Sequence, residues 1–222
     1  VACVEGALKQ TFQDFDIWVV DDGSTDYTAE ALKPYLSDKV HYIYQKNAHV
    51  SAARNNGIRS SKGEYLVFID DDDVSLPNRL SDYAELIERH PEVDVLFTDL
   101  WKIHIKDGVP HGKPERFTEK LSIFPKMFKE GATGDFFVFS SKEMWKTLLV
   151  EFPLKPSTWC MHRRCFENHG FFNEHVCPSE PLELILRLNR VGVTWGYIDR
   201  PTIKYFVWGG NIGVVSKTKA PI

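Results

Sequence analysis

Four consecutive aspartates at positions 70–73 are the strongest chemical signal in this sequence. They directly follow the apolar run "EYLVFI" (64–69), which is typical of a buried strand. Neighbouring carboxylates repel one another and raise each other's pKa, so four of them need compensating charge. A divalent ion such as Mg²⁺ or Mn²⁺ prefers carboxylate oxygens, and it can carry the phosphates of a nucleotide. The plainer alternative is a solvated loop whose acids favour the N-terminus of the next helix.

A second acidic loop, "DDGSTD" (21–26), follows the apolar run "FDIWVV" (15–20). Taken alone, this loop is typical of a turn and a helix cap, because Ser, Thr and Asp are good caps and Gly23 can adopt a positive φ. In parallel α/β sheets, however, ligands bind beyond the carboxyl ends of the strands. Since both acidic loops follow a strand, we expect them at the same edge of one sheet.

Arg54 lies between the two loops, in the segment "SAARNNGI" (51–58), which is predicted to be helical. A guanidinium there can pair with a phosphate or with one of the aspartates. The alternative is an exposed helical arginine, in a helix whose small residues merely permit close packing on the sheet. The sequence does not decide between these interpretations.

The first 105 residues alternate between strand and helix patterns, which predicts a Rossmann-like, mostly parallel sheet flanked by helices. The predicted strands are 15–20, 40–45, 64–69 and 93–103, and the predicted helices are 4–12, 28–36, 50–61 and a helix with Pro77 in its first turn that runs to about His90.

After residue 106 the pattern loosens into a smaller, mixed part. Residues 106–117, with two prolines and two glycines, are predicted to form a loop. "PLELILRLNRVG" (181–192) is predicted to be an amphipathic helix that ends at Gly192. The remaining strand candidates are "FFVFS", "STWCMHR", "VTWGYID" and "TIKYFVW".

The bulk composition excludes some classes of protein. The chain has 222 residues, a net charge of −4 and a pI of about 6.1, so nucleic acid is not an expected partner. No apolar stretch is long enough to span a membrane, and we expect a cytoplasmic protein, with peripheral membrane association left open. A zinc site is an alternative for one cluster, but its spacing fits no common pattern. That cluster is Cys160, Cys165, His169, His175 and Cys177.

Three segments together resemble the inverting, family 2 glycosyltransferases with the GT-A fold: residues 11–32, residues 50–80 and "LELILRL". The resemblance covers most of residues 1–212. It implies a hexosyl- or N-acetylhexosaminyl-transferase type of enzyme in glycan or cell-surface polysaccharide synthesis. Within one domain, residues 1–105 would bind a nucleoside diphosphate sugar, with UDP as the commoner nucleotide. Residues 106–222 would then bind the acceptor, a glycan or a lipid-linked molecule.

The resemblance also implies roles for the acidic loops. By this resemblance, Asp21 and Asp22 contact the nucleotide base, and Arg54 lies near the nucleotide. Residues 70–72 match the DXD motif of the family, in which Asp70 and Asp71 contact ribose and diphosphate. Asp72 is then the ligand of a Mn²⁺ or Mg²⁺ cofactor, which stabilises the departing diphosphate.

The candidate base shows the first departure from the family pattern. An inverting transfer needs a carboxylate that deprotonates the acceptor hydroxyl. The family places it in a Glu-Asp pair before the "ELxLRL" helix, but this chain has Glu180 followed by Pro181. Glu180 is therefore the predicted base, and Glu183 is expected to be structural.

Two further departures concern the ends of the resemblance. Trp208 stands where the family often has a metal-binding histidine, and an indole N–H cannot ligate a metal. It can instead stack on a base or sugar, or close the pocket. The opening strand of the family is missing, and we expect that the sequence given lacks the true N-terminus.

These departures leave two alternatives to a glycosyltransferase. One is a nucleotide-sugar-binding domain with weak or no transfer. The other is a nucleotidyltransferase, which also uses carboxylate-bound metals. Nucleotidyltransferases usually carry a Gly-rich or basic loop at the triphosphate, and this sequence shows no such loop.

Overall fold

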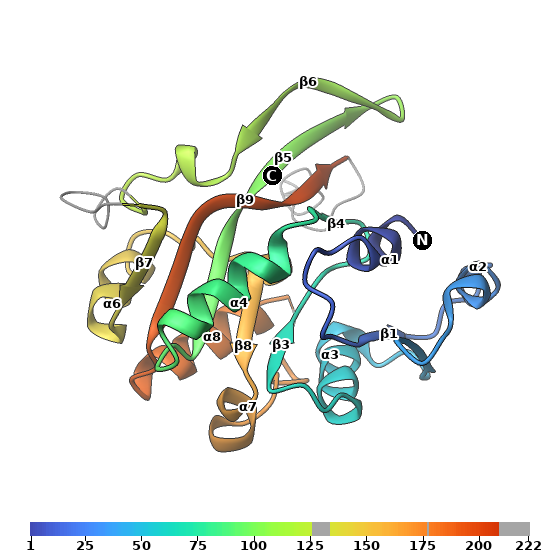
Figure 1. Cartoon of the computed structure of the whole chain (residues 1–222), viewed down its shortest axis with the longest axis horizontal. Helices are drawn as coiled ribbons and strands as arrows, with labels where there is room; N and C mark the ends of the chain where they lie inside the picture. Colours follow the sequence, from blue (N-terminus) through green and yellow to red (C-terminus); the bar gives the residue numbers. More distant parts are fainter. Residues whose placement is uncertain (126–133, 177, 209–222) are drawn as a thin grey trace, which may run out of the picture.

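The computed structural model describes residues 1–125, 134–176 and 178–208 (Figure 1). The expected α/β architecture is confirmed, with two sheets and flanking helices. Cys177 and residues 209–212, which the sequence analysis considered, lie outside the described residues. In the described part of the chain, no helix is long and apolar enough to cross a membrane.

The N-terminal third forms a small parallel sheet with its own core. Strands β1 (Ile17–Asp21) and β2 (Val40–Tyr44) pair in parallel, and Val4, Leu32 and Val40 form the buried cluster beside them. The other elements of this part are α1 (Ala2–Leu8), α2 (Thr28–Leu32), the 3₁₀ turn η1 (Lys33–Tyr35) and α3 (His49–Ser60).

The second sheet has seven strands of mixed direction. Its path is β3–β8–β5–β9–β4, with β6 beside β5 and β7 beside β9. Strands β5 and β9 pair in parallel, and the other described pairs of this sheet are antiparallel. Its strands are β3 (Tyr65–Val67), β4 (Val74–Ser75), β5 (Val95–Lys106), β6 (Val109–Arg116), β7 (Phe136–Phe139), β8 (Trp159–His162) and β9 (Trp195–Val207).

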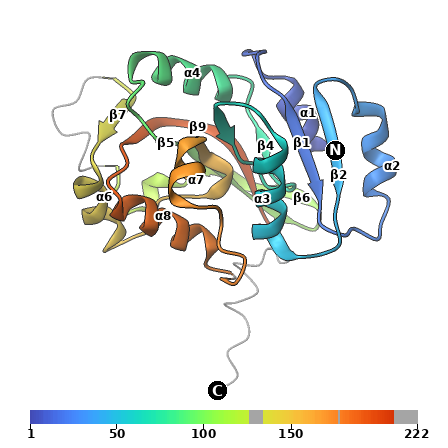
Figure 2. The same cartoon turned by 90° about the horizontal axis from the view of Figure 1, so that it is seen from below.

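Alternation along β5 creates a core on each face of this sheet. Val95 and Phe97 belong to the larger buried cluster, with side chains of α7 and α8. Leu96 belongs to a second cluster with Leu86 of α4, since successive side chains of a strand point to opposite faces. Figure 2 shows α4 on one side of the sheet and α7 and α8 on the other. The helices are α4 (Arg79–Arg89), α6 (Ser141–Leu148), α7 (Arg164–His169) and α8 (Glu180–Arg190), with 3₁₀ turns η2 (Thr118–Lys120) and η3 (Pro156–Thr158).

The prediction of a loop over residues 106–117 was wrong, because β6 forms a hairpin with β5 there. Asp107 (φ 52°) and Gly108 (φ 79°) make the turn, and an Asp-Gly pair with two positive φ angles is a strong hairpin signal. In the described residues β6 pairs with β5 alone, so its two prolines are tolerated as they are in edge strands.

Two boundaries also differ from the predictions. The two strand candidates in 193–208 form one long strand, β9, with an irregularity where Asp99 of β5 pairs with Pro201. Helix α4 begins at Arg79, so Pro77 precedes the helix instead of lying in its first turn.

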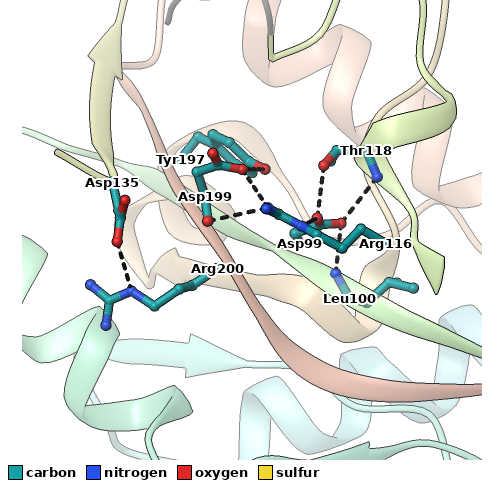
Figure 3. A network of polar contacts seen from close by, with 8 residues as sticks. All are labelled: Asp99, Leu100, Arg116, Thr118, Asp135, Tyr197, Asp199 and Arg200. Atoms are coloured by element: carbon teal, nitrogen blue, oxygen red, sulfur yellow. Dashed lines mark hydrogen bonds and ion pairs between the residues drawn. The ribbon is translucent and has the colours of Figure 1, made fainter. Parts of the chain in front are cut away.

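A buried polar network fastens the hairpin to β9 (Figure 3). Arg116 of β6 donates to Asp99 of β5 at 2.7 Å and to Asp199 of β9 at 2.5 Å. Thr118 donates to Asp99 through both its hydroxyl and its backbone N–H. The network thus fixes three strands relative to one another in the second half of the chain.

Candidate functional site

The first acidic loop begins with Asp21, which is buried at the end of β1. Its carboxylate accepts hydrogen bonds from the Ser24 backbone N–H at 2.7 Å and the Tyr42 hydroxyl at 2.5 Å. Burial raises the pKa of Asp21, but these hydrogen bonds outweigh it, and its pKa lies below the ordinary value. The bond to Asp21 raises the pKa of Tyr42 to about 12. Asp21 is therefore an ionised acceptor inside the loop.

Asp22 connects the first acidic loop to α3. Its Oδ1 accepts from Gln45 Nε2 at 2.7 Å and from the Ala48 backbone N–H at 2.8 Å. Gln45 in turn accepts a bond from Asn56 of α3 at 2.9 Å. Gly23 has a φ of 85°, and a Cβ there would lie 2.8 Å from the Asn47 backbone nitrogen, so the expectation of positive φ is confirmed.

The expectation that both acidic loops end strands of one sheet was wrong. β1 pairs with β2 in the small sheet, whereas β3, before the second loop, pairs with β8 in the large one. Helix α3 relates the two loops instead. Its Asn56 reaches the first loop through Gln45, and its Arg54 reaches the second.

Arg54 joins two carboxylates that are far apart in sequence. Its Nη2 lies 2.9 Å from Oδ1 of Asp70, and its Nη1 lies 3.1 Å from Oε1 of Glu180. Its guanidinium carbon lies 5.4 Å from the centre of the Phe172 ring, within cation–π range. The Arg54 side chain is only 12% exposed. Of the interpretations that the sequence left open, the structure shows the pairing with an aspartate.

The four aspartates of the acidic loop 70–73 differ in how far they are buried. Asp71 is exposed, Asp70 and Asp72 are half-buried, and Asp73 is fully buried. Neither side-chain oxygen of Asp73 accepts a hydrogen bond from the described residues. Burial raises the pKa of Asp73 to about 7 against the lowering effects of the Ser157 hydroxyl and Arg79, and the charges of Asp70 and Asp72 raise it further. Burial therefore disfavours the charged form of Asp73 inside this acidic loop.

Two residues that the sequence analysis missed support this loop. Arg79, which is buried, donates to the carbonyls of Phe68 at 2.7 Å and Ser157 at 2.5 Å, and so ties the end of β3 to η3. Burial raises the pKa of Tyr205 of β9, and the charges of Asp73, Asp72 and Asp70 raise it further. Neither residue carries a motif, and only the tertiary structure brings them here.

Glu180 is the first residue of α8 and is 5% exposed. Its Oε1 pairs with Arg54, while its Oε2 is buried and accepts no hydrogen bond from the described residues. Pro181 is in the first turn of the helix, where its missing N–H costs nothing. Glu183 pairs with Arg187 at 2.8 Å one turn along, which is the structural contact that the sequence analysis expected.

Trp208, the last described residue, follows β9 directly and is 41% exposed. Its predicted place in the pocket stays a prediction, because the structure holds no ligand beside it. The predicted contacts of Asp21, Asp22, Asp70 and Asp71 with a nucleotide stay predictions for the same reason.

The loop chemistry fits a divalent ion that is only partly bound by protein. Among the described residues, no three His, Cys, Asp or Glu side chains converge to form a complete ligand set. Mg²⁺ in nucleotide sites commonly takes one or two carboxylates, and phosphates and waters complete its shell. Within the described residues, the oxygens of Asp73 that accept no hydrogen bond, beside the carboxylates of Asp70 and Asp72, suit such a cation.

The zinc alternative finds no support in the described part of the chain. Burial raises the pKa of Cys160 and Cys165 to about 12, so both remain neutral thiols. Cys165 lies 3.5 Å from the Asp94 carbonyl, to which it donates. Among the described residues, no group of three or more metal-ligating side chains includes these cysteines.

Curated relatives of this chain are glycosyltransferases. GlyA of Streptococcus pneumoniae serotype 4 is 27% identical over 159 residues, which are 67% of this chain and 23% of the relative. GlyG of the same organism is 34% identical over 111 residues, which are 49% of this chain and 36% of the relative. The chain thus spans about a quarter to a third of the length of these relatives.

Solved structures of TarS from S. aureus share the fold. TarS 1-349 in complex with UDP has a TM-score of 0.68 and 21% identity, over 94% of this chain and 56% of that one. TarS 1-349 in complex with UDP-GlcNAc has a TM-score of 0.70 and 21% identity, over 98% and 57%. The family model described as "Glycosyl transferase family 2" matches residues 1–146. This chain therefore belongs to glycosyl transferase family 2.

Proposed function

We propose that this protein transfers a sugar, with inversion, from a nucleoside diphosphate sugar to an acceptor hydroxyl. The observation that carries the proposal is the convergence of Asp70 and Glu180 on Arg54, which brings the predicted donor loop and the predicted base together. UDP is the proposed nucleotide, because the TarS structures that share this fold were solved with UDP and with UDP-GlcNAc.

Asp21 and Asp22 belong to the proposed binding site of the nucleotide base. The two hydrogen bonds that described residues donate to Asp22 both reach its Oδ1, so we assign Oδ2 to accept an imide N–H of uracil. Asp21 is committed to Tyr42 and Ser24, and we assign it the task of holding the loop in shape. The 70–73 loop then faces the ribose and diphosphate through Asp70 and Asp71.

Asp72 is the proposed ligand of Mn²⁺ or Mg²⁺. When bound, the ion supplies positive charge where the departing diphosphate gains negative charge. Asp73, the next residue, is buried, and its carboxylate would add negative potential toward such a cation when it is ionised.

Glu180 is the proposed general base. Its Oε2 takes the proton of the acceptor hydroxyl while the hydroxyl oxygen bonds to the anomeric carbon of the sugar. The bond from that carbon to the diphosphate oxygen breaks at the same time, and the electron pair leaves with the diphosphate. Attack from the opposite face inverts the configuration. The acceptor, a glycan or lipid-linked molecule, would bind over the residues after 105, and we place the protein in the cytoplasm.

A second candidate function is donor binding with little or no transfer. The burial of Glu180 and its ion pair with Arg54 favour this candidate, because an acceptor hydroxyl must reach Oε2. The two candidates predict the same donor binding and differ in turnover.

A panel of UDP-, GDP- and dTDP-sugars, each with Mn²⁺ and with EDTA, tests both candidates. A ligand that binds the folded state raises the melting temperature, so one nucleotide class should raise it only with Mn²⁺. Release of the free nucleotide from that donor should follow for a transferase and be absent for a binding domain. If no donor shifts the melting temperature, both candidates are contradicted.

A further inference from the structure

The Arg54 guanidinium is held by contacts with Asp70, Glu180 and Phe172, unlike that of an exposed arginine. Asp70 binds one terminal nitrogen, Glu180 binds the other, and the Phe172 ring lies against the guanidinium. The next residue of α3, Asn55, holds the backbone of Phe172 through two hydrogen bonds. Its amide nitrogen donates to the Phe172 carbonyl at 2.9 Å, and its amide oxygen accepts from the Phe172 N–H at 2.9 Å.

Glu180 has one defined partner in the described residues. As the first residue of α8, it would be favoured there by the helix dipole without an arginine. Its side chain is nevertheless buried: Oε1 pairs with Arg54, and Oε2 accepts no hydrogen bond from residues 1–125, 134–176 or 178–208. A planar guanidinium that is already fixed on two sides sets the orientation of a carboxylate, and a flexible ammonium does not.

We propose that Arg54 is the positioning residue for Glu180. Its guanidinium holds Oε1, which leaves Oε2 as the oxygen that takes the acceptor proton. Because the same guanidinium is bound to Asp70, the general base Glu180 is positioned relative to the acidic loop 70–73. The inference rests on the proposed function, and it assigns Arg54 to the base where the family resemblance assigned it to the nucleotide.

A double-mutant cycle in the full chain tests this role. The variants are Arg54→Ala, Glu180→Gln and the double variant, with Arg54→Lys as a second, milder change. Arg59→Ala is the matched control, because Arg59 is on the same helix and lies 4.8 Å from the Phe171 ring but contacts neither carboxylate. The measured quantities are UDP release from UDP-GlcNAc and UDP-glucose with Mn²⁺, the donor Kd by calorimetry, and the melting temperature.

Arg54→Ala should lower kcat about 100-fold, which is the scale of a small misplacement of a reacting group, and leave the donor Kd within about threefold. The double variant should be no slower than Glu180→Gln alone, because residues that act as one unit are not additive. Arg54→Lys should fall between wild type and Arg54→Ala, and Arg59→Ala should match wild type.

Two results would overturn the positioning role while the wild type still releases UDP. One is a loss in Arg54→Ala that a weaker donor Kd explains, which would make Arg54 a nucleotide ligand. The other is a double variant in which the two losses multiply. If Arg54→Ala does not fold, Arg54→Lys with and without Glu180→Gln gives the same comparison. A wild type that releases no UDP from any donor would instead contradict the proposed function.

Discussion

Two groups of buried carboxylates in this protein differ in how completely they are paired. Asp99, in the network of Figure 3, accepts hydrogen bonds from the backbone of Leu100 and Thr118, from the Thr118 hydroxyl and from Arg116. Asp73, in the acidic loop, is equally buried, and its side-chain oxygens accept no hydrogen bond from the described residues.

We propose that this difference separates a structural acid, Asp99, from a functional one, Asp73. Asp99 has donors that replace the lost water, and removing it would leave those buried donors without their acceptor. Within the part of the chain that the structure describes, the oxygens of Asp73 and Oε2 of Glu180 accept no hydrogen bond, and both residues belong to the proposed site. Buried carboxylates without partners are costly, and they are expected where a ligand, cation or proton arrives during function.

The largest effect on stability is expected from Asp99→Ala. This change leaves the partly buried guanidinium of Arg116 without its Asp99 partner. Breaking a buried ion pair lowers the free energy of unfolding by about 3–5 kcal/mol. Chemical denaturation should show this loss in the free energy of unfolding. Asp135→Ala is the control, since Asp135 is exposed and pairs with Arg200 at 3.2 Å, and its loss should cost less than about 1 kcal/mol. Equal losses in both variants would contradict the structural role of the network.

Asp73→Asn should raise the free energy of unfolding, whereas Asp99→Ala should lower it. The unfolded chain releases this proton near pH 4, about the usual pKa of aspartate, and the folded protein releases it near 7. Stability from this group therefore falls as pH rises from about 4 to 7 and stays low above it. In buffer with EDTA at pH 8, Asp73→Asn should be more stable than wild type by about 2 kcal/mol, because the amide carries no charge to desolvate.

The pH series supplies the check on Asp73. Wild type and Asp73→Asn should differ least near pH 4 and most above pH 7, as measured by denaturant unfolding at each pH. A constant difference across this range would mean that Asp73 titrates normally, and the contrast with Asp99 would fail.

The smallest effect is expected from Gln45→Ala, which cuts the link from Asp22 to α3. Losing this orientation should weaken donor binding about fivefold, the equivalent of roughly one hydrogen bond. Gln13→Ala is the control, because Gln13 also bonds through its side chain, to Gln10 and Lys39, away from the acidic loops. Equal donor affinities in the two variants would contradict the proposed contact of Asp22 with the nucleotide base.

Local patterns in the sequence predicted the elements that carry the site. The apolar runs before Asp21 and Asp70 and the helix around Arg54 are in the expected places, because periodicity and capping are local properties. The β5–β6 hairpin was missed because its prolines outweighed the Asp-Gly turn signal. Tertiary facts were beyond local patterns: Arg54 and Glu180 are 126 residues apart, and the burial of Asp73 exceeds that of its neighbours.

Donor binding by Asp72→Ala tests the central claim most directly. Calorimetry with UDP-GlcNAc and UDP-glucose, each with Mn²⁺ and with EDTA, would compare this variant with wild type and with Asp135→Ala. We expect wild type and Asp135→Ala to bind only with Mn²⁺, and Asp72→Ala to bind neither donor. Mn²⁺-dependent binding of unchanged affinity in Asp72→Ala would contradict the account.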